Sequence, residues 1–366
     1  MERIEKSSLD SLDSPCLLVI QERVQENIQL AISMMKDPSQ LRPHIKTHKN
    51  PWIIDLCIQK GIEKFKCATI AEAELLALQG AKDILLAYPL NSPKIGRLTS
   101  LIDQYPKSIF SCLVDNKELI NLLNEEGIKK NHPISVWLDI NTGMDRTGMK
   151  VQEIPAFYDF ISSLKGIQFQ GFHNYPGHIV QSNLDLRRVE FVQANQEMES
   201  IFKEFINQGI NCRYIVGGTP CFPFYSQNPL LESSPGTFIY WDFGYQNYYP
   251  EQKFKVAAYL LSRVVSKPNS DLICLDLGYK SVSSEKPLSE RVYFPSMPDA
   301  KFISQSEEHL VLKTNIHPMI QVGDSYLGIP YHICPTVALY ESIEKIENGK
   351  WIGSSLNLAR NRKIYH

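Results

Sequence analysis

The feature that most constrains the fold of this chain is a repeated alternation between residues 24 and 250. Short apolar or β-branched runs alternate there with longer stretches of helical periodicity. The runs predict strands at 43–48, 65–70, 84–88, 110–115, 134–140, 168–175, 213–217 and 238–243. Helices are expected at 24–35, 53–60, 71–78, 94–105, 117–125, 154–164 and 184–207, and the Pro-, Ser- and Gly-rich link 218–237 is interpreted as loop. Strands that alternate with helices form parallel sheets, and eight such units close a TIM (β/α)8 barrel.

The pattern changes beyond residue 250. Strand-like runs at 255–265, 272–278, 309–314 and 325–339 are separated by turn signals and show little helical periodicity. This sequence pattern is typical of an antiparallel β domain. A further strand at 16–20 is expected to pair with that domain. The α/β prediction is therefore a barrel domain at 21–250, followed by a β domain at 251–366 that also includes residues 1–20.

Composition excludes several classes of function. Lysine and arginine (38) nearly balance aspartate and glutamate (40), so no basic excess indicates a nucleic-acid or anionic-membrane partner. No apolar run is long enough to span a membrane, and the first ten residues, MERIEKSSLD, are too polar for a signal peptide. The eight cysteines form no CxxC pair and are expected to be mostly buried thiols. These features predict a cytoplasmic protein.

The densest cluster of reactive side chains is RPHIKTHK at 42–49. If residues 43–48 form a strand, then His44, Lys46 and His48 share one face, because side chains alternate with period two. Burial lowers the pKa of an amine, which suits a lysine that forms a Schiff base. Two other interpretations stay open at this point, namely a solvated lysine and a metal-dependent hydrolase that uses His44 and His48 as ligands.

Three further segments follow predicted strands, at the end of a barrel where active sites gather. Arg146 lies between two glycines in GMDRTGM, and Tyr175 and His178 flank the turn YPGH. Two glycine-bearing turns, Gly218-Thr219 and Gly244-Tyr245, offer backbone amides that suit a phosphate group. Each of these segments is also compatible with an ordinary surface turn.

A last segment, PYHICPT at 330–336, lies in the predicted β domain. On a strand, His332 and Cys334 would share a face, and imidazole with thiolate would bind a borderline-soft cation such as zinc. Two protein ligands leave positions open for water or substrate. The alternative is a buried cysteine beside a hydrogen-bonded histidine.

Together these segments resemble the D-threonine aldolase and D-serine dehydratase family of pyridoxal-phosphate enzymes. RPHIKTHK and PYHICPT are the specific segments, and GMDRTGM, YPGH, GGTP and FGY occur in the expected order. The resemblance implies an alanine-racemase-like barrel that binds pyridoxal 5′-phosphate (PLP), followed by a β domain. It implies that Lys46 binds the cofactor covalently. The other implied assignments are His44 and Tyr175 beside the cofactor, Arg146 facing its pyridine ring, Gly218, Thr219, Gly244 and Tyr245 at its phosphate, Tyr175 and His178 in catalysis, and His332 and Cys334 as ligands of zinc or manganese.

The resemblance also implies a function. We expect a lyase for D-β-hydroxy amino acids, most simply a retro-aldol enzyme that releases glycine and an aldehyde with help from a divalent metal. Dehydratase-type β-elimination to ammonia and a 2-oxo acid is the alternative, and a non-catalytic PLP-binding protein is a remote one. A homodimer is expected from the family, while no residue of this sequence identifies the native substrate.

Overall fold

The computed structural model describes residues 4–315 and 317–365. Its internal contacts divide the chain into two compact units. The barrel unit comprises Ala31–Lys46, Ile54–Gly236 and Asn361–His366, and the β unit comprises Met1–Leu30, Thr47–Ile53 and Thr237–Arg360. None of the helices in the described ranges combines the length and the apolar character that crossing a bilayer requires.

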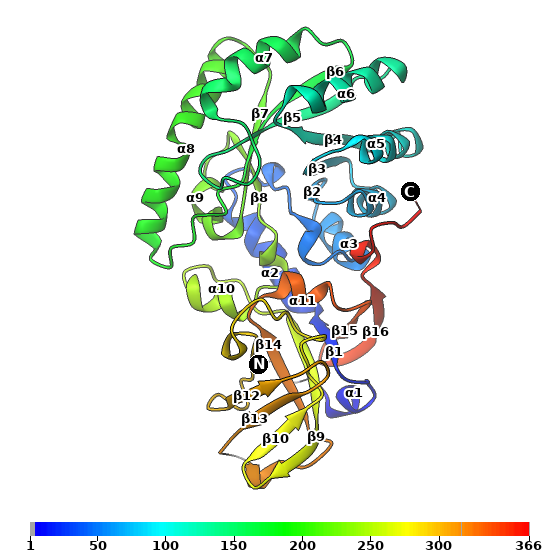
Figure 1. Ribbon diagram of the computed structural model, residues 1–366, viewed down its shortest axis with the longest axis vertical. Helices are drawn as coiled ribbons and strands as arrows, with labels where there is room; N and C mark the ends of the chain where they lie inside the picture. The colour runs from blue at the N-terminus through cyan, green and yellow to red at the C-terminus, as the bar shows by residue number, and fades with distance from the viewer. Residues whose placement is uncertain (1–3, 316, 366) are drawn as a thin grey trace. The chain divides into compact units, whose positions relative to one another are not determined.

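The barrel unit contains a parallel sheet that, among the described residues, has seven strands in the order β2 to β8. These strands are β2 (Lys64–Cys67), β3 (Asp83–Pro89), β4 (Ile109–Val114), β5 (Ile134–Ile140), β6 (Ile167–Asn174), β7 (Arg213–Gly217) and β8 (Leu231–Ser234). Helices alternate with them and lie around the outside of the sheet (Figure 1). They are α4 (Ile70–Leu78), α5 (Ser92–Gln104), α6 (Lys117–Lys129), α7 (Ile154–Ser162), α8 (Leu184–Asn207) and the short α9 (Phe222–Tyr225). The expected α/β barrel is confirmed, with its ring of strands nearly closed.

The predicted first strand at 43–48 is wrong. Residues on either side of Pro43 make only two isolated parallel bridges, Leu41 with Ser233 of β8 and His44 with Lys66 of β2. The segment therefore lies between the first and last strands and links them without a ladder. The chain then turns into a 3-10 helix at Ile45–Thr47. Nδ1 of His44 accepts the Lys46 amide at 3.2 Å, a local side-chain bond that competes with strand pairing.

The predicted last strand at 238–243 is also wrong. The strand at this point of the barrel is β8, which lies inside the link that was interpreted as loop. Its sequence, LESS, is mostly polar yet fully buried. The search for apolar runs therefore did not predict this strand. Residues 238–243 instead include a 3-10 helix at Thr237–Ile239 and lead into α10 (Phe243–Tyr248).

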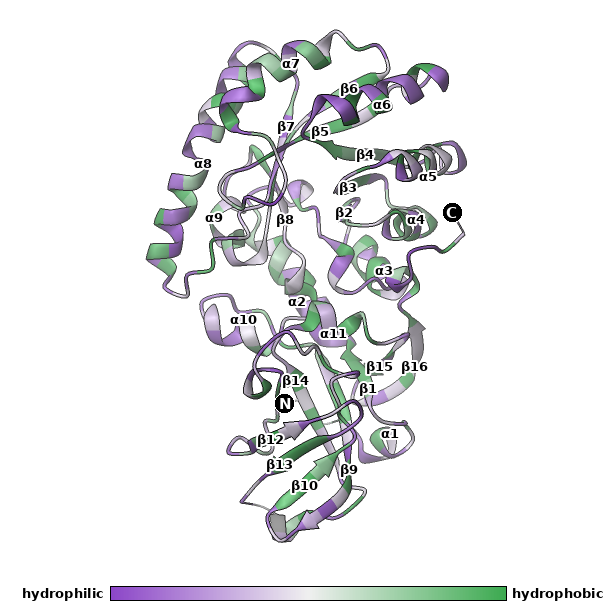
Figure 2. Cartoon of the chain, in the orientation of Figure 1, coloured by the Kyte–Doolittle hydropathy of each residue, from purple (hydrophilic) through white to green (hydrophobic). Residues whose placement is uncertain are grey.

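The interior of the barrel unit contains an apolar cluster next to a buried arginine. Leu85, Leu113, Trp137 and Ile215 form a buried cluster contributed by four different strands. The guanidinium of Arg42 lies 5.8 Å from the Trp137 ring. Outside the sheet, helices such as α8 are banded in hydrophobic and hydrophilic residues, as expected for helices that bury one face (Figure 2).

The β unit is built on a mostly antiparallel sheet with nine strands among the described residues. Strand β1 (Cys16–Ile20) pairs antiparallel with β9 and parallel with β15. The remaining strands are β9 (Ala258–Asn269), β10 (Leu272–Leu275), β11 (Val292–Tyr293), β12 (Lys301–Gln305), β13 (Leu310–Lys313), β14 (Ser325–Pro330), β15 (Ser342–Glu347) and β16 (Lys350–Leu356). The helices are α1 (Lys6–Asp10), α10 and α11 (Ile333–Val337), while α2 (Gln21–Met34) and α3 (Pro51–Gln59) each include a unit boundary.

Candidate active site

Lys46 is the central residue of the candidate site in the barrel unit. Its side chain is half-buried, and Nζ lies 5.4 Å from the centroid of the Tyr175 ring. His44 is buried next to it and accepts its backbone amide. His48 belongs to the β unit, where burial lowers its pKa to about 3 and keeps the imidazole neutral. The strand face that was predicted to present His44, Lys46 and His48 together does not exist.

Tyr175 and Arg146 meet at the carboxyl end of the barrel strands. Tyr175 directly follows β6, and Arg146 lies in the loop after β5 with its guanidinium carbon 4.9 Å from the Tyr175 ring centroid. Both residues line a small cavity of about 30 Å³ together with Asp139 and His173. The structure therefore brings Lys46 and Arg146 to the same tyrosine ring, while their roles stay predictions.

The turn after β7 borders the same tyrosine. Gly218 has a φ of +95°, and a Cβ on it would lie 3.3 Å from the Tyr175 ring. Oγ1 of Thr219 accepts the amide of Gly236 at 3.2 Å, so the turns that follow β7 and β8 adjoin. Their backbone amides suit a phosphate group. Sequence analysis missed Gly236 because it missed β8, although the Ser-Pro-Gly turn was visible.

A row of buried, hydrogen-bonded polar side chains borders the cavity. Sequence analysis missed this row as well. Nζ of Lys66 is 3.4 Å from Nε2 of His173, and Nδ1 of His173 is 2.8 Å from Oδ1 of Asp139. Thr147 donates its hydroxyl to the other oxygen of Asp139 at 2.8 Å. The alternation in KFKC, with Lys66 between two apolar residues of a barrel strand, was the available signal.

The pKa values of Lys66, His173 and Asp139 are all shifted from their usual values. Burial, followed by the positive charge of Lys46, lowers the pKa of Lys66 well below its usual value. Burial opposes ionisation of Asp139, but hydrogen bonds from His173 and Thr147 and the attraction of His173 and Lys66 together outweigh it, so the pKa of Asp139 is lowered. Burial and the neighbouring Lys66 lower the pKa of His173. Near neutral pH, Asp139 is therefore ionised and the imidazole of His173 is neutral.

His178 lies apart from this cavity lining. Its side chain is exposed, and its Nε2 lies 2.9 Å from where a Cβ on Gly143 would be, in the loop after β5. The predicted catalytic role of His178 stays a prediction, because the described contacts of its ring are with the loop and not with Lys46.

The predicted metal ligands lie in the β unit but not on a strand. Strand β14 ends at Pro330, His332 is the N-cap residue of α11, and Cys334 is in the first turn of that helix. The Pro-x-His-x-Cys-Pro spacing stops the ladder, because a second proline follows Cys334. The strand geometry predicted for this pair is therefore wrong.

His332 and Cys334 nevertheless contact each other. Burial alone would lower the pKa of His332, but hydrogen bonding and attraction to Cys334, with a further bond to Glu285, raise it to about 9. Nδ1 of His332 lies 2.6 Å from a carboxylate oxygen of Glu285. Because Glu285 engages Nδ1, Nε2 is the nitrogen left to bind a metal, as in carboxylate–histidine–metal triads.

Two threonine hydroxyls lie near the sulfur of Cys334. Its sulfur lies 3.1 Å from Oγ1 of Thr47 and 3.6 Å from Oγ1 of Thr237. Across the described ranges, no group of three or more His, Cys, Asp or Glu side chains is placed to hold a metal. An imidazole and a thiol on one helical turn fit a borderline-soft divalent ion that keeps open positions.

Gly244 and Tyr245 occupy the first turn of α10. The buried carboxylate of Asp242 caps this helix by accepting the Tyr245 amide at 2.8 Å, and its second oxygen accepts the Ile333 amide at 3.1 Å. A Cβ on Gly244 would lie 2.5 Å from the Tyr331 carbonyl oxygen, so close packing already requires glycine there. The phosphate role of Gly244 and Tyr245 stays a prediction.

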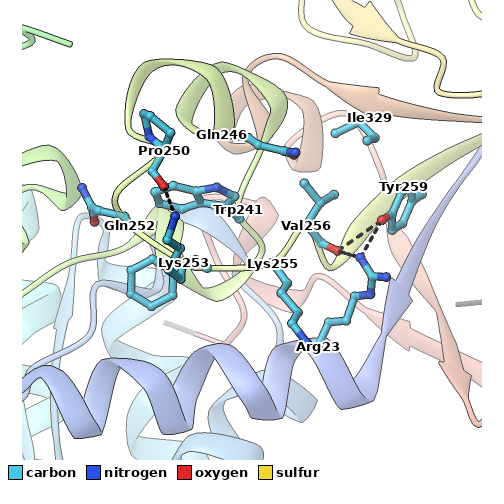
Figure 3. A pocket seen from close by; sticks show the side chains of 11 residues that line it. Arg23, Trp241, Gln246, Pro250, Gln252, Lys253, Lys255, Val256, Tyr259 and Ile329 are labelled. Carbon is cyan, nitrogen blue, oxygen red and sulfur yellow. Dashed lines mark hydrogen bonds between the residues drawn. The ribbon is translucent and has the colours of Figure 1, made fainter. Parts of the chain in front are cut away.

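The β unit also has a cavity of about 520 Å³ that includes none of the predicted site residues (Figure 3). Its polar groups largely bind one another. Arg23 donates to the Val256 carbonyl and to the Tyr259 hydroxyl, both at 2.9 Å, and Lys253 donates to the Pro250 carbonyl at 2.8 Å. We assign no chemistry to this cavity.

Comparison with known proteins adds two family matches. The model described as the alanine racemase N-terminal domain matches residues 19–242, and the putative serine dehydratase domain matches residues 257–344. A D-threonine aldolase from an Arthrobacter species is 24% identical over 84% of this chain and 82% of its own. A D-threo-3-hydroxyaspartate dehydratase from a Delftia species is 21% identical over 93% of this chain and 96% of its own.

Solved structures show the same fold. D-threonine aldolase from Filomicrobium marinum superposes with a TM-score of 0.86 at 22% identity, covering 96% of each chain. The Delftia dehydratase gives a TM-score of 0.79 at 21% identity, covering 96% of this chain and 99% of that one. Solved variants of a D-threo-3-hydroxyaspartate dehydratase replace a histidine and a cysteine two positions apart, the cysteine variant being in its metal-free form. His332 and Cys334 have the same spacing.

Proposed function

Because the chain belongs to the alanine racemase N-terminal domain family, we propose that it is a PLP-dependent lyase that cleaves D-β-hydroxy amino acids with the help of a divalent metal. Relatives that match most of the chain are named D-threonine aldolase, 3-hydroxy-D-aspartate aldolase and D-threo-3-hydroxyaspartate dehydratase. Alanine-racemase-like enzymes use PLP, whose bound ring acts as an electron sink for carbanion chemistry.

The observation that supports this function best is the setting of Lys46. Its amine lies over Tyr175, which also contacts Arg146 and borders the Gly218 turn. Three cationic or basic groups, Lys46, Arg146 and Lys66, interact at this end of the barrel, and Asp139 is the acidic group that offsets them. A site with this excess of basic groups suits an anionic phosphate and an anionic substrate carboxylate.

A second observation concerns the fit of the cofactor. Oγ of Ser234 is buried and has no hydrogen-bond partner among the described residues. Ser234 is two residues from Glu232 on β8, and Glu232 contacts the interior residue Arg42, so Ser234 faces the same interior. A buried hydroxyl with no partner is costly, so a polar ligand in the barrel would satisfy it.

The roles of the remaining groups follow from their chemistry. Lys46 would hold the cofactor and would serve as the base at the substrate Cα. Tyr175 would pack beside the ring, while Arg146 would bind a negative group at the open side of the cavity. His332 and Cys334 would hold the metal ion, which supplies a Lewis acid for the β-hydroxyl of the substrate.

We propose retro-aldol cleavage as the reaction, in line with the aldolases among the relatives. A base would then accept the β-hydroxyl proton, and His178 is the candidate from the sequence. β-Elimination is the second candidate, because the histidine–cysteine pair has the spacing of the pair replaced in variants of a D-threo-3-hydroxyaspartate dehydratase. In that case Lys46 would accept the Cα proton.

Product analysis separates these reactions. The purified protein is loaded with PLP and incubated with D-threonine, D-serine or 3-hydroxy-D-aspartate, with added Zn²⁺ or Mn²⁺ and with a chelator. Glycine with an aldehyde identifies the aldolase, whereas ammonia with a 2-oxo acid identifies the dehydratase. Absence of turnover, together with absence of a visible cofactor band, would contradict the proposed function as a whole.

A further inference from the structure

A further cavity of the barrel unit, of about 460 Å³, lies apart from the candidate active site. Its lining comes from the end of β3, from the first residues of α4 and α5, and from the tail at 361–365, so we call it the α4–α5 cavity. Ala87 of β3 lines the small cavity with Tyr175 and Arg146, whereas its neighbours Leu86 and Tyr88 line the α4–α5 cavity. Because successive side chains of a strand point to opposite faces, the two cavities lie on opposite faces of β3.

The charged side chains of the α4–α5 cavity are all positive. Lys94, Arg97 and Arg362 line it, and the described part of its lining includes no acidic residue. Nζ of Lys94 lies 4.4 Å from the centroid of the Tyr88 ring, an aromatic contact that leaves the charge uncompensated. For neither Lys94 nor Arg362 do the described residues provide a carboxylate partner. A hollow lined by charges of one sign concentrates ions of the opposite sign, so this cavity attracts anions.

The position of Arg362 is defined by its neighbours in the barrel unit. Nη2 of Arg97 on α5 donates to the carbonyl oxygen of Arg362 at 2.8 Å. Three residues further along the tail, the amide of Tyr365 donates to the buried carboxylate of Glu74 on α4 at 3.2 Å. Both bonds use the backbone of the tail. The guanidinium of Arg362 is therefore held at the cavity while its own donors remain for a ligand.

The rest of the lining suits an organic molecule better than a bare ion. Oγ1 of Thr69, the N-cap residue of α4, accepts the amide of Glu72 at 3.1 Å, so its own O–H remains a donor. The ring of Tyr88 is 48% exposed and provides a flat surface. Small-molecule sites combine a largely apolar wall with a few polar groups in a volume of this size. The apolar wall here consists of Ala68, Ile70, Leu86 and Leu90.

We propose that the α4–α5 cavity binds a small organic oxyanion, a phosphate monoester or a carboxylate carried on an apolar body. Arg97, Arg362 and Lys94 bind the oxyanion, because guanidinium groups offer paired N–H donors that match its oxygens. The same ligand contacts α5 and the tail, so its binding also holds the tail in place. This site is separate from the proposed reaction and does not rest on the proposed function.

Calorimetric titration tests the site with two probes, phenyl phosphate and benzoate. The full chain is loaded with PLP and freed of excess cofactor, so that oxyanion positions in the candidate active site are already occupied. At least one probe should bind, and the tighter of the two identifies the oxyanion. Phenol, which lacks the charge, should bind far more weakly. Failure of both probes to bind would overturn the proposal.

Three variants assign the binding to this cavity. Arg362→Met and Lys94→Met each remove a positive group, and each should weaken the better probe by roughly 10- to 100-fold, the range expected for hydrogen bonds to a charged group. Arg362 is exposed, so its replacement should leave the fold intact. Lys363→Met is the matched control. It removes the same charge from the next, exposed residue of the tail, which is not part of the lining, and should bind like the wild type.

Trypsin provides a second measurement that does not depend on calorimetry. The better probe, at saturation, should slow cleavage after Arg362, because the ligand holds that side chain. Arg97→Met removes both a ligand group and the bond to the tail, so the probe should give this variant no protection. Mass spectrometry of the released tail peptide gives the rates. Equal rates with and without the probe in the wild type would overturn the proposed contact with Arg362.

The outcomes also separate this site from the proposed function. Unchanged affinity in both Arg362→Met and Lys94→Met, or an equal loss in Lys363→Met, would overturn the α4–α5 site and leave the proposed function untouched. A protein that takes up no PLP would contradict the proposed function alone. The titrations then proceed on the unloaded chain, and the same three variants decide whether the probe binds in the α4–α5 cavity.

Discussion

Nε of Arg42 lies 2.7 Å from a carboxylate oxygen of Glu232, and both side chains are almost completely buried. The same guanidinium donates a bidentate pair of hydrogen bonds to the two carboxylate oxygens of Asp83, at 2.8 and 2.9 Å. Asp83 begins β3 and Glu232 is in β8, so Arg42 joins the two sides of the barrel where the sheet has no continuous ladder. The ion pairs of Arg42 with Asp83 and Glu232 therefore join the two sides of the ring where backbone pairing between strands is interrupted.

Replacing Arg42 by methionine should destabilise the protein strongly. The change leaves two buried carboxylates without their main partner, for which about 3–5 kcal/mol of unfolding free energy is expected. Urea denaturation measures the loss. The matched control is Lys82→Met, which removes an exposed ion pair with Glu63 and should cost less than about 1 kcal/mol. Equal effects of the two changes would contradict a structural role for the Arg42 group.

Acid should weaken the same group through Asp83. Burial alone would raise the pKa of this carboxyl, but Arg42 and then Arg213 outweigh it and lower the pKa from 3.8 to about 2. A carboxyl with a lowered pKa stabilises the fold above its unfolded value, and this stability disappears as the pH falls from about 4 to 2. The contribution is about 2 kcal/mol. Unfolding free energy measured against pH should fall less steeply for Asp83→Asn than for the wild type in this window.

The barrel could be predicted because most of its strands are buried, apolar and separated by helices. β4 after its first residue and β5 throughout are buried and mostly apolar, as expected for parallel strands that are covered on both faces. β8 could not be predicted in this way. Its Glu232 and Ser234 are buried inside the barrel, where a partner such as Arg42, distant in sequence, makes a charged residue tolerable.

The candidate site was predictable where several reactive residues are adjacent in the sequence. Lys46 and the pair of His332 and Cys334 lie in such segments, although their local structure is helical and not extended. Lys66 and His173 were not found, because each lies within a strand and is not adjacent to other reactive residues in a recognisable motif. Their significance arises only when distant strands bring them within 3.4 Å.

Changing Lys46 to alanine should abolish covalent attachment of the cofactor. Borohydride reduction of the PLP-loaded wild type should add the cofactor to a peptide containing Lys46, as mass spectrometry would show. The Lys46→Ala variant should fold normally, because the side chain is only half-buried, and should yield no such peptide. Lys49→Arg, a change three residues away that keeps the charge, should label like the wild type. Labelling at any other lysine in the wild type would refute the assignment.

Cys334→Ala should remove metal binding while leaving the cofactor in place. The change deletes one of only two proposed protein ligands, so the stoichiometry of bound Zn²⁺, measured after dialysis, should fall from about one to near zero. The visible absorbance of the bound PLP should persist. Cys274→Ala, which removes a buried thiol elsewhere in the β unit, is the matched control and should retain its zinc. Retention of zinc by Cys334→Ala would exclude this sulfur from the site.

Glu285→Gln should weaken metal binding without removing a ligand. The carboxylate of Glu285 lies 2.6 Å from Nδ1 of His332 and orients the ring, so its loss leaves Nε2 less basic and less well aimed. Partners of this kind contribute roughly 10- to 100-fold to metal affinity, so the dissociation constant for Zn²⁺ should rise by that factor. Competition with a chromophoric chelator measures the change. Glu290→Gln, a nearby substitution in the same unit, should leave the affinity unaltered. An unchanged affinity in Glu285→Gln would show that the ring of His332 does not depend on this carboxylate for its orientation.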